Sequence, residues 1–221
     1  MNERLLSTDT QTHDRPFPLR MARYAIQQGS EPTSALASQL IILRAMGHTT
    51  LTMEDLKRDW TNSNYVIMPI GSLNLAGALT LDAVLRQYGV ETESYNLFAQ
   101  RNENDTLQEP LTWLIERVER QRGVVVQVET EELPTLAELY GDAESWPDAA
   151  CALVILGMIR DVSGVIQSYL VIDPLLGEHI RTRGPISVPA AEFESAWYAR
   201  GCIAVATLEP ARRSKTTIQL A

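Results

Sequence analysis

The chain has 221 residues, of which 45% are hydrophobic and 21% charged, with a formal net charge of -9 and an isoelectric point near 4.9. This composition fits one globular domain that can bury a core, and the acidic balance argues against nucleic acid or an anionic membrane surface as partner. No apolar stretch reaches the about 20 residues that a membrane-spanning helix needs. Because the polar N-terminus also lacks the apolar core of a secretion signal, we expect a cytoplasmic protein without membrane insertion.

The first half of the sequence predicts helices. Residues 1–22 are polar and without pattern, so we expect an N-terminal extension. After it, apolar residues cover a broad face of a helix that Gly47 ends as a C-cap, and Thr52 with Asp55 resembles the capping box of a second helix. The helices predicted in this half cover residues 34–46, 53–60, 73–88 and 110–122.

The second half predicts strands. Apolar and β-branched runs indicate strands at residues 124–130, 150–158, 165–173, 179–188 and 202–208. Shorter helices are expected at residues 135–140 and 192–197. Because helices come first and antiparallel strands follow, the predicted fold class is α+β, with one domain over residues 23–210 and a tail at residues 211–221.

The sequence predicts neither a metal site nor an organic cofactor. No spacing of His, Cys, Asp or Glu matches a metal site, and the string GSLNLAG lacks the Lys-Ser/Thr ending of a phosphate loop. The two cysteines, Cys151 and Cys202, lie in apolar runs where a reduced thiol behaves as a small hydrophobe. A disulfide between them is the alternative in an oxidising compartment.

Several strings resemble, in order and spacing, the papain-like domain of bacteriocin-processing peptidases and related peptidase-like domains. Gln28 lies six residues before Ser34, which begins an apolar helix ending in LRAMGH. Later strings of the same template are GSLNLAGALTLDAVLRQYGVE, GVVVQV, ALVILGMIRD, YLVIDPLLG and AAEFESAWYARGCIAVAT. The resemblance covers about residues 24–210 and implies a papain-like fold, in which N-terminal helices pack on a C-terminal antiparallel sheet.

The resemblance also implies a catalytic layout with two changed residues. Such domains use a Cys nucleophile at a helix start, a His base, an Asp or Asn that orients the His, and a Gln oxyanion donor. It places Gln28 at the oxyanion donor, Ser34 at the nucleophile, Cys151 at the base and Asp173 at the orienting residue. An alcohol at Ser34 needs a base, and a buried thiol at Cys151 stays protonated. The resemblance therefore implies a degenerate, inactive site.

Each of these residues also has a simpler structural interpretation. Ser34 is a favourable helix cap, Cys151 a buried core thiol, and Asp173 before Pro174 a good turn residue. Gln28 can be a solvated loop residue. Both interpretations stay open from the sequence alone.

Three hypotheses on function follow. The first is an inactive papain-like domain that binds a peptide or protein partner in its former substrate cleft, with Tyr140 and Trp146 of an acidic segment as aromatic anchors. Transporter-associated relatives that lack the thiol and bind substrate without cutting it supply the analogy. The alternative is a serine-dependent acyl hydrolase or peptidase in which His179 or His48 activates Ser34. The third is a subunit of a larger assembly whose interface lies away from the cleft.

Overall fold

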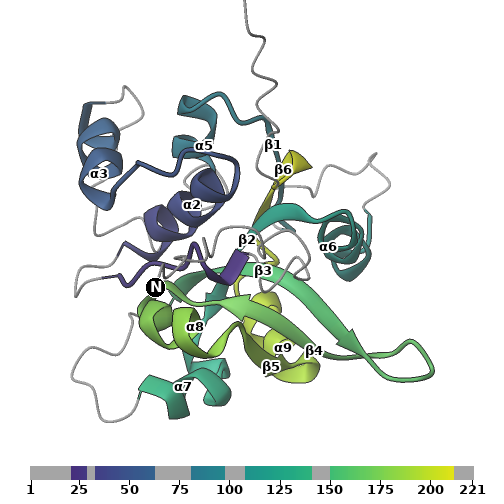
Figure 1. The fold of residues 1–221 in the computed structure, drawn as a ribbon. Coiled ribbons are helices and arrows are strands. Elements are labelled where there is room, and N and C mark those ends of the chain that lie inside the picture. Colours follow the sequence, from purple (N-terminus) through teal and green to yellow (C-terminus); the bar gives the residue numbers. More distant parts are fainter. Residues whose placement is uncertain (1–20, 29–32, 63–80, 98–107, 141–149, 212–221) are drawn as a thin grey trace, which may run out of the picture.

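Helices surround one antiparallel sheet in this protein, of which the computed structural model describes residues 21–28, 33–62, 81–97, 108–140 and 150–211 (Figure 1). The helices are α2 (Ser34–Ala45), α3 (Met53–Asn62), α5 (Ala83–Gln87), α6 (Pro110–Glu119), α7 (Pro134–Tyr140), α8 (Gly177–Arg183) and α9 (Ala190–Ala199). Two 3-10 turns are η3 (Thr130–Glu132) and η4 (Pro174–Leu176). The strands are β1 (Thr92–Tyr95), β2 (Arg122–Glu129), β3 (Ala150–Arg160), β4 (Ile166–Ile172), β5 (Ile186–Pro189) and β6 (Ala204–Pro210).

The six strands are ordered β1-β6-β2-β3-β4-β5, and every neighbouring pair is antiparallel. Strand β2 is buried from Gly123 to Val128 and β3 from Ala150 to Leu156, which requires cover on both faces of the sheet there. Helix α2 packs against β2 and β3, while α9 packs against β2, β4 and β5. Figure 1 shows α2 above the sheet and α9 below it. This arrangement confirms mixed helices and antiparallel sheet.

The central helix α2 is mostly apolar and is buried along almost its whole length. It approaches the sheet closely at Gly123, where a Cβ atom would lie 2.8 Å from Cγ2 of Ile42. A larger residue at position 123 would therefore push the helix from the sheet. The absence of a side chain here lets β2 begin directly beneath α2.

Two predicted helix starts are confirmed by their capping hydrogen bonds. The Asp55 amide donates to Thr52 Oγ1 over 3.1 Å, and the Thr52 amide donates to Asp55 Oδ2 over 3.0 Å. This reciprocal pair is a capping box, with Asp in the place of the more usual Glu. At α6 the carboxylate of Glu109 accepts from the Thr112 amide over 2.9 Å, and Pro110 takes the first turn.

The strand predicted at residues 179–188 is wrong over its first half. Residues Gly177–Arg183 form helix α8, and only Ile186–Pro189 pair with β4, as the edge strand β5. The helix buries Ile180 and is held by Arg181, whose guanidinium donates to the carbonyl of Ala25 over 3.2 Å. Its partner lies 156 residues earlier, so no local pattern could indicate this contact. The short edge strand β1 was not predicted either, because only Tyr95 is buried in it.

The packed part of the chain extends slightly beyond the predicted domain. Met21, Ala22 and Ala211 are buried in the core, although the sequence assigned them to the extension and the tail. The structure describes the helix predicted at residues 73–88 only from residue 81 onward, and in this part it contains the short helix α5. Within the described ranges, no helix has both the length and the apolar character to cross a membrane.

Candidate functional site

Two serine hydroxyls dock the start of α2 onto β3. Ser34 Oγ accepts a hydrogen bond from the Ala152 amide over 3.1 Å, and Ser38 Oγ donates to the Ala152 carbonyl over 3.0 Å. Within the described residues, strand β4 pairs with β3 only from Val154 outward, so β4 supplies no partner for the amide and carbonyl groups of Ala152. The serines, one helical turn apart, satisfy both groups, and Ser34 is buried by this packing.

Cys151 precedes this docking point and lies in the core. Its side chain is buried and forms no disulfide, and Cys202 is likewise a free, buried cysteine. Burial raises the pKa of the Cys151 thiol well above its usual value, and the nearby Asp173 carboxyl adds to the increase. The thiol is therefore protonated at neutral pH, as expected for a core cysteine and not for a general base.

Asp173 is the buried acid of the site. It caps η4, where its Oδ1 accepts from the Leu175 amide over 2.8 Å, and its Oδ2 accepts from the phenol of Tyr140 on α7. Asp173 is 0% exposed, and this burial raises its pKa to about 6. The two hydrogen bonds lower the pKa, but by less than burial raises it. Burial also raises the pKa of Tyr140, so the phenol stays a donor.

The segment with Gln28 is fixed against η4 and α8. The backbone amide of Gln28 donates to the Pro174 carbonyl over 2.8 Å, and the side-chain oxygen Oε1 of Gln27 accepts from the backbone amide of Glu178 over 2.9 Å. Gly177 makes this approach possible, because a Cβ atom there would lie 2.0 Å from the carbonyl oxygen of Ile26. Gln28 is buried and adjoins the turn that Asp173 begins.

The structure thus places the four predicted catalytic positions in one region. Ser34 contacts the strand beside Cys151, Cys151 lies within electrostatic range of Asp173, and Gln28 contacts Pro174. Their proposed family roles stay predictions. The sequence did not identify Ser38 or Gln27 as members of the region, although each lies on the same short segment as a predicted residue.

The predicted aromatic anchors differ in position. Trp146 lies outside the described residues, so its role stays a prediction. Tyr140 is partly buried, and its phenol points at Asp173. A binding role for Tyr140 therefore has to involve its ring and not its hydroxyl group.

The two candidate histidines occupy different places relative to Ser34. His48 follows the far end of α2, a helix of 12 residues that spans about 18 Å at the usual rise per residue. His179 lies on α8, next to η4, and not on the predicted strand.

Among the described residues, no group of three or more His, Cys, Asp or Glu side chains could hold a metal ion.

Comparison with known proteins identifies a likeness in fold. No protein-family model matches the chain, and no curated protein matches it. Among solved structures, the chain is similar to the crystal structure of a candidate C39-like peptidase from Bacillus anthracis, with a TM-score of 0.53 and 17% sequence identity. The likeness covers 83% of this chain and 93% of the other. The chain has a peptidase-like fold.

For this peptidase-like domain the likeness supports the papain-type arrangement that the sequence resemblance implies. At 17% identity it concerns the fold alone, because one fold carries unrelated activities. What the domain does has to be argued from its own residues.

Proposed function

We propose that this peptidase-like domain is catalytically inactive and binds a peptide or protein partner through its former substrate cleft. The observation that carries the proposal is that the carboxylate of Asp173 already has hydrogen-bond partners within the chain. Both of its carboxylate oxygens accept hydrogen bonds from the chain itself, from the Leu175 amide and from Tyr140. In an active layout this carboxylate would orient an imidazole.

The chemistry of Ser34 supports the same proposal. An alcohol becomes a nucleophile only when a base accepts its proton, and the position that the resemblance gives to the base carries the protonated thiol of Cys151. A positioned base contributes about 10² to 10⁴ in rate. The Ser34 oxygen also accepts the Ala152 hydrogen bond, which withdraws electron density from it.

Retention of the scaffold supports the binding part of the proposal. The contacts of Ser34, Ser38 and Gln28 hold α2, β3 and η4 together without requiring any reactive group. In papain-like proteins the substrate lies between this helix and the sheet, and by analogy we expect the partner of this domain to bind there. The proposed ligand is a peptide or a protein segment that lies there.

Inactivity is tested by exposing the folded protein to a broad fluorophosphonate and measuring its intact mass, with Ser34→Ala as the matched variant. We expect no adduct in either protein. A stoichiometric adduct that disappears in Ser34→Ala would overturn the proposal and favour the serine hydrolase with a relocated histidine.

Binding is tested with peptides selected from a random display library against the folded protein. Trp146→Ala should weaken the affinity of a selected peptide at least about fivefold, which corresponds to about 1 kcal/mol. Val162→Ala is the control, because Val162 is fully exposed on the loop between β3 and β4. Peptides whose affinity is unchanged in Trp146→Ala but reduced in Val162→Ala would place the binding surface elsewhere.

A further inference from the structure

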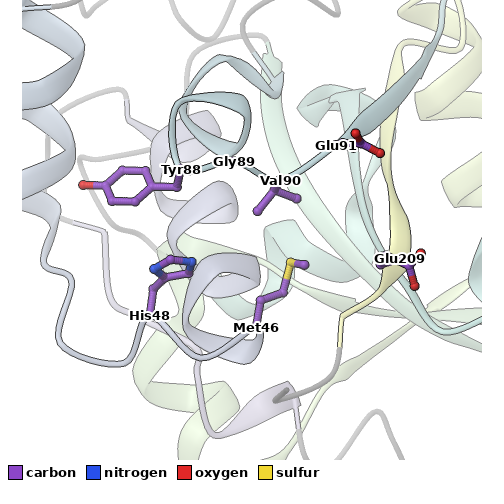
Figure 2. Close-up of a pocket in the computed structure, with 7 residues that line it drawn as sticks. All are labelled: Met46, His48, Tyr88, Gly89, Val90, Glu91 and Glu209. Atoms are coloured by element: carbon purple, nitrogen blue, oxygen red, sulfur yellow. The ribbon is translucent and has the colours of Figure 1, made fainter. Parts of the chain in front are cut away.

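A pocket of about 350 Å³ lies at the opposite end of α2 from Ser34. Met46, Tyr88 and Val90 give this pocket an apolar surface, and Glu209 of β6 forms part of its rim. Figure 2 shows Met46 and Val90 between the ring of Tyr88 on one side and Glu209 on the other. Met46 and Tyr88 are only partly buried, so the pocket leaves apolar surface in contact with water that an apolar occupant would cover.

The aromatic wall of the pocket is held in place by its own contacts. The His48 amide donates to the Leu43 carbonyl over 3.0 Å just beyond α2. The rings of His48 and Tyr88 meet edge to face at 5.6 Å, and the Tyr88 hydroxyl donates to Asp59 over 2.5 Å. This wall is therefore preorganised, and an occupant does not have to order it.

The chain leaves the described fold beside this pocket. Strand β6 ends at Pro210, one residue after Glu209, and Ala211 is buried with its amide donating to the Gln121 carbonyl over 3.0 Å. Residues 212–221 continue from this fixed point and lie outside the part of the chain that the structure describes. Ile218 comes seven residues after Ala211, an extended reach of about 23 Å. This reach covers every wall of a pocket that Glu209 itself lines.

The same segment carries side chains that suit the pocket. Ile218 and Leu220 stand at alternate positions in the string TTIQLA. In an extended segment, residues two apart point to the same side, so both aliphatic side chains can enter one cavity together. An apolar cavity of about 150 Å³ holds a molecule of the size of benzene, so this larger pocket has room for both side chains.

Charge also favours this segment as the occupant. Residues 212–221 carry Arg212, Arg213 and Lys215 and no acid. Because the whole chain has a net charge of -9 and these three cations contribute +3, the remaining residues carry a net charge of -12. A basic segment tethered to an acidic body is attracted to it over distances of about a Debye length.

The charges beside the pocket do not oppose an apolar occupant. β1 pairs with β6 so that Thr92 faces Thr207, which puts Glu209 on the face of Val90 and the Glu91 side chain on the other face. Arg44, on the last turn of α2, carries a charge opposite to that of Glu209. The attraction on the basic segment therefore comes from the acidic body as a whole, and the pocket contributes apolar contact.

We propose that residues 212–221 fold back on their own chain and place Ile218 and Leu220 in this pocket, against Met46, Val90 and the Tyr88 ring. A short flexible tether gives an effective concentration on the order of millimolar, so a contact with a millimolar dissociation constant populates the docked form. Another ligand of this pocket has to displace the segment first. The docking lies beyond the proposed function and does not depend on it, because the pocket and Ser34 are at opposite ends of α2.

The test compares two double variants of the full chain by nuclear magnetic resonance. Ile218→Ser with Leu220→Ser removes both aliphatic side chains, and Thr217→Ser with Gln219→Ser is the matched control at the intervening positions. In the native chain we expect nuclear Overhauser contacts from the Ile218 or Leu220 methyl groups to the Met46 methyl group. The first double variant should shift the Met46 methyl and the Val90 amide resonances, and the control should not. Missing Overhauser contacts in the native chain, or equal shifts in both variants, would overturn the proposal.

A titration with the free peptide of residues 212–221 identifies the chain that supplies the segment. It should restore the shifts in the Ile218→Ser, Leu220→Ser protein with a dissociation constant of about 1 to 10 mM. It should bind the native chain at least about twofold more weakly, because the tethered segment competes. No saturation up to about 20 mM, or equal affinity for both proteins, would overturn the proposal. Native-chain shifts that disappear on tenfold dilution would assign the pocket to the segment of a second copy and overturn docking within one chain.

Discussion

Asp173 is a carboxyl group enclosed in the interior, and its titration connects the site to the stability of the fold. Its pKa is raised from 3.8 to about 6 by burial. Between these two values the folded state binds more protons than the unfolded state, so the free energy of unfolding falls as the pH rises. The stabilising contribution of the protonated Asp173 carboxyl is fully present below about pH 4 and is lost as the pH rises through about 6.

Asp173→Asn should remove this pH dependence, because an amide does not titrate. The difference in unfolding free energy between the native protein and the variant should change by about 2.5 kcal/mol between pH 4 and pH 7, in the direction that favours the variant at the higher pH. Urea denaturation at several pH values measures it. Parallel stability curves for the two proteins would contradict a buried carboxyl with a raised pKa.

Tyr140→Phe removes the phenol that donates to Asp173 while keeping the ring. Hydrogen bonds to charged groups contribute about 1.5 to 3 kcal/mol, so we expect a loss near 2 kcal/mol at pH 7.5, where Asp173 is ionised. Tyr198→Phe is the control, since its hydroxyl donates to Glu109 at the surface. The cost should shrink in the Asp173→Asn background, and equal costs in both backgrounds would show that the two residues are not coupled.

At the scale of elements, α2 and β3 are held together by the hydroxyls of Ser34 and Ser38. Ser38→Ala leaves the Ala152 carbonyl without its donor in a buried position and should cost about 1 to 3 kcal/mol. Ser195→Ala on α9 removes an exposed hydroxyl and should cost less than about 0.5 kcal/mol. Thermal unfolding compares the two, and a similar small loss in both would indicate that water replaces the Ser38 contact.

Gly177→Ala tests the contact between α8 and the segment that carries Gln28. The added Cβ atom would overlap the backbone of Ile26, so this segment or the helix has to move. We expect a loss of about 2 kcal/mol or more, with shifted amide resonances at Gln27 and Gln28. Thr182→Ala on the exposed side of the same helix should leave these resonances in place. Unchanged resonances in Gly177→Ala would contradict the close approach.

At the scale of the whole molecule, the local signals predicted most of the elements. The apolar run of α2, the capping box at Thr52 and the hairpin of β3 and β4 each follow from residues adjacent in sequence. The peptidase-like arrangement followed from the order of these strings and is supported by the structural likeness.

The rest could not be predicted because its causes lie far apart in the chain. Helix α8 depends on the backbone at Ala25, and the partner of Asp173 lies 33 residues before it, on α7. The pocket beyond the end of α2 is lined by residues far apart in the sequence, among them Met46, Tyr88 and Glu209, which only the fold brings together (Figure 2). A sequence pattern predicts the helix or strand to which a residue belongs, whereas these contacts depend on how the helices and strands pack together.

The position of β6 between β1 and β2 has a consequence for how the protein is made. A ribosome synthesises β1 and β2 first, but these strands meet only through a strand that ends at Pro210. Until then each offers an open edge that can pair with another chain. We therefore expect the nascent chain to be prone to aggregation until β6 pairs with both strands, and deletion of β6 to give an aggregating chain.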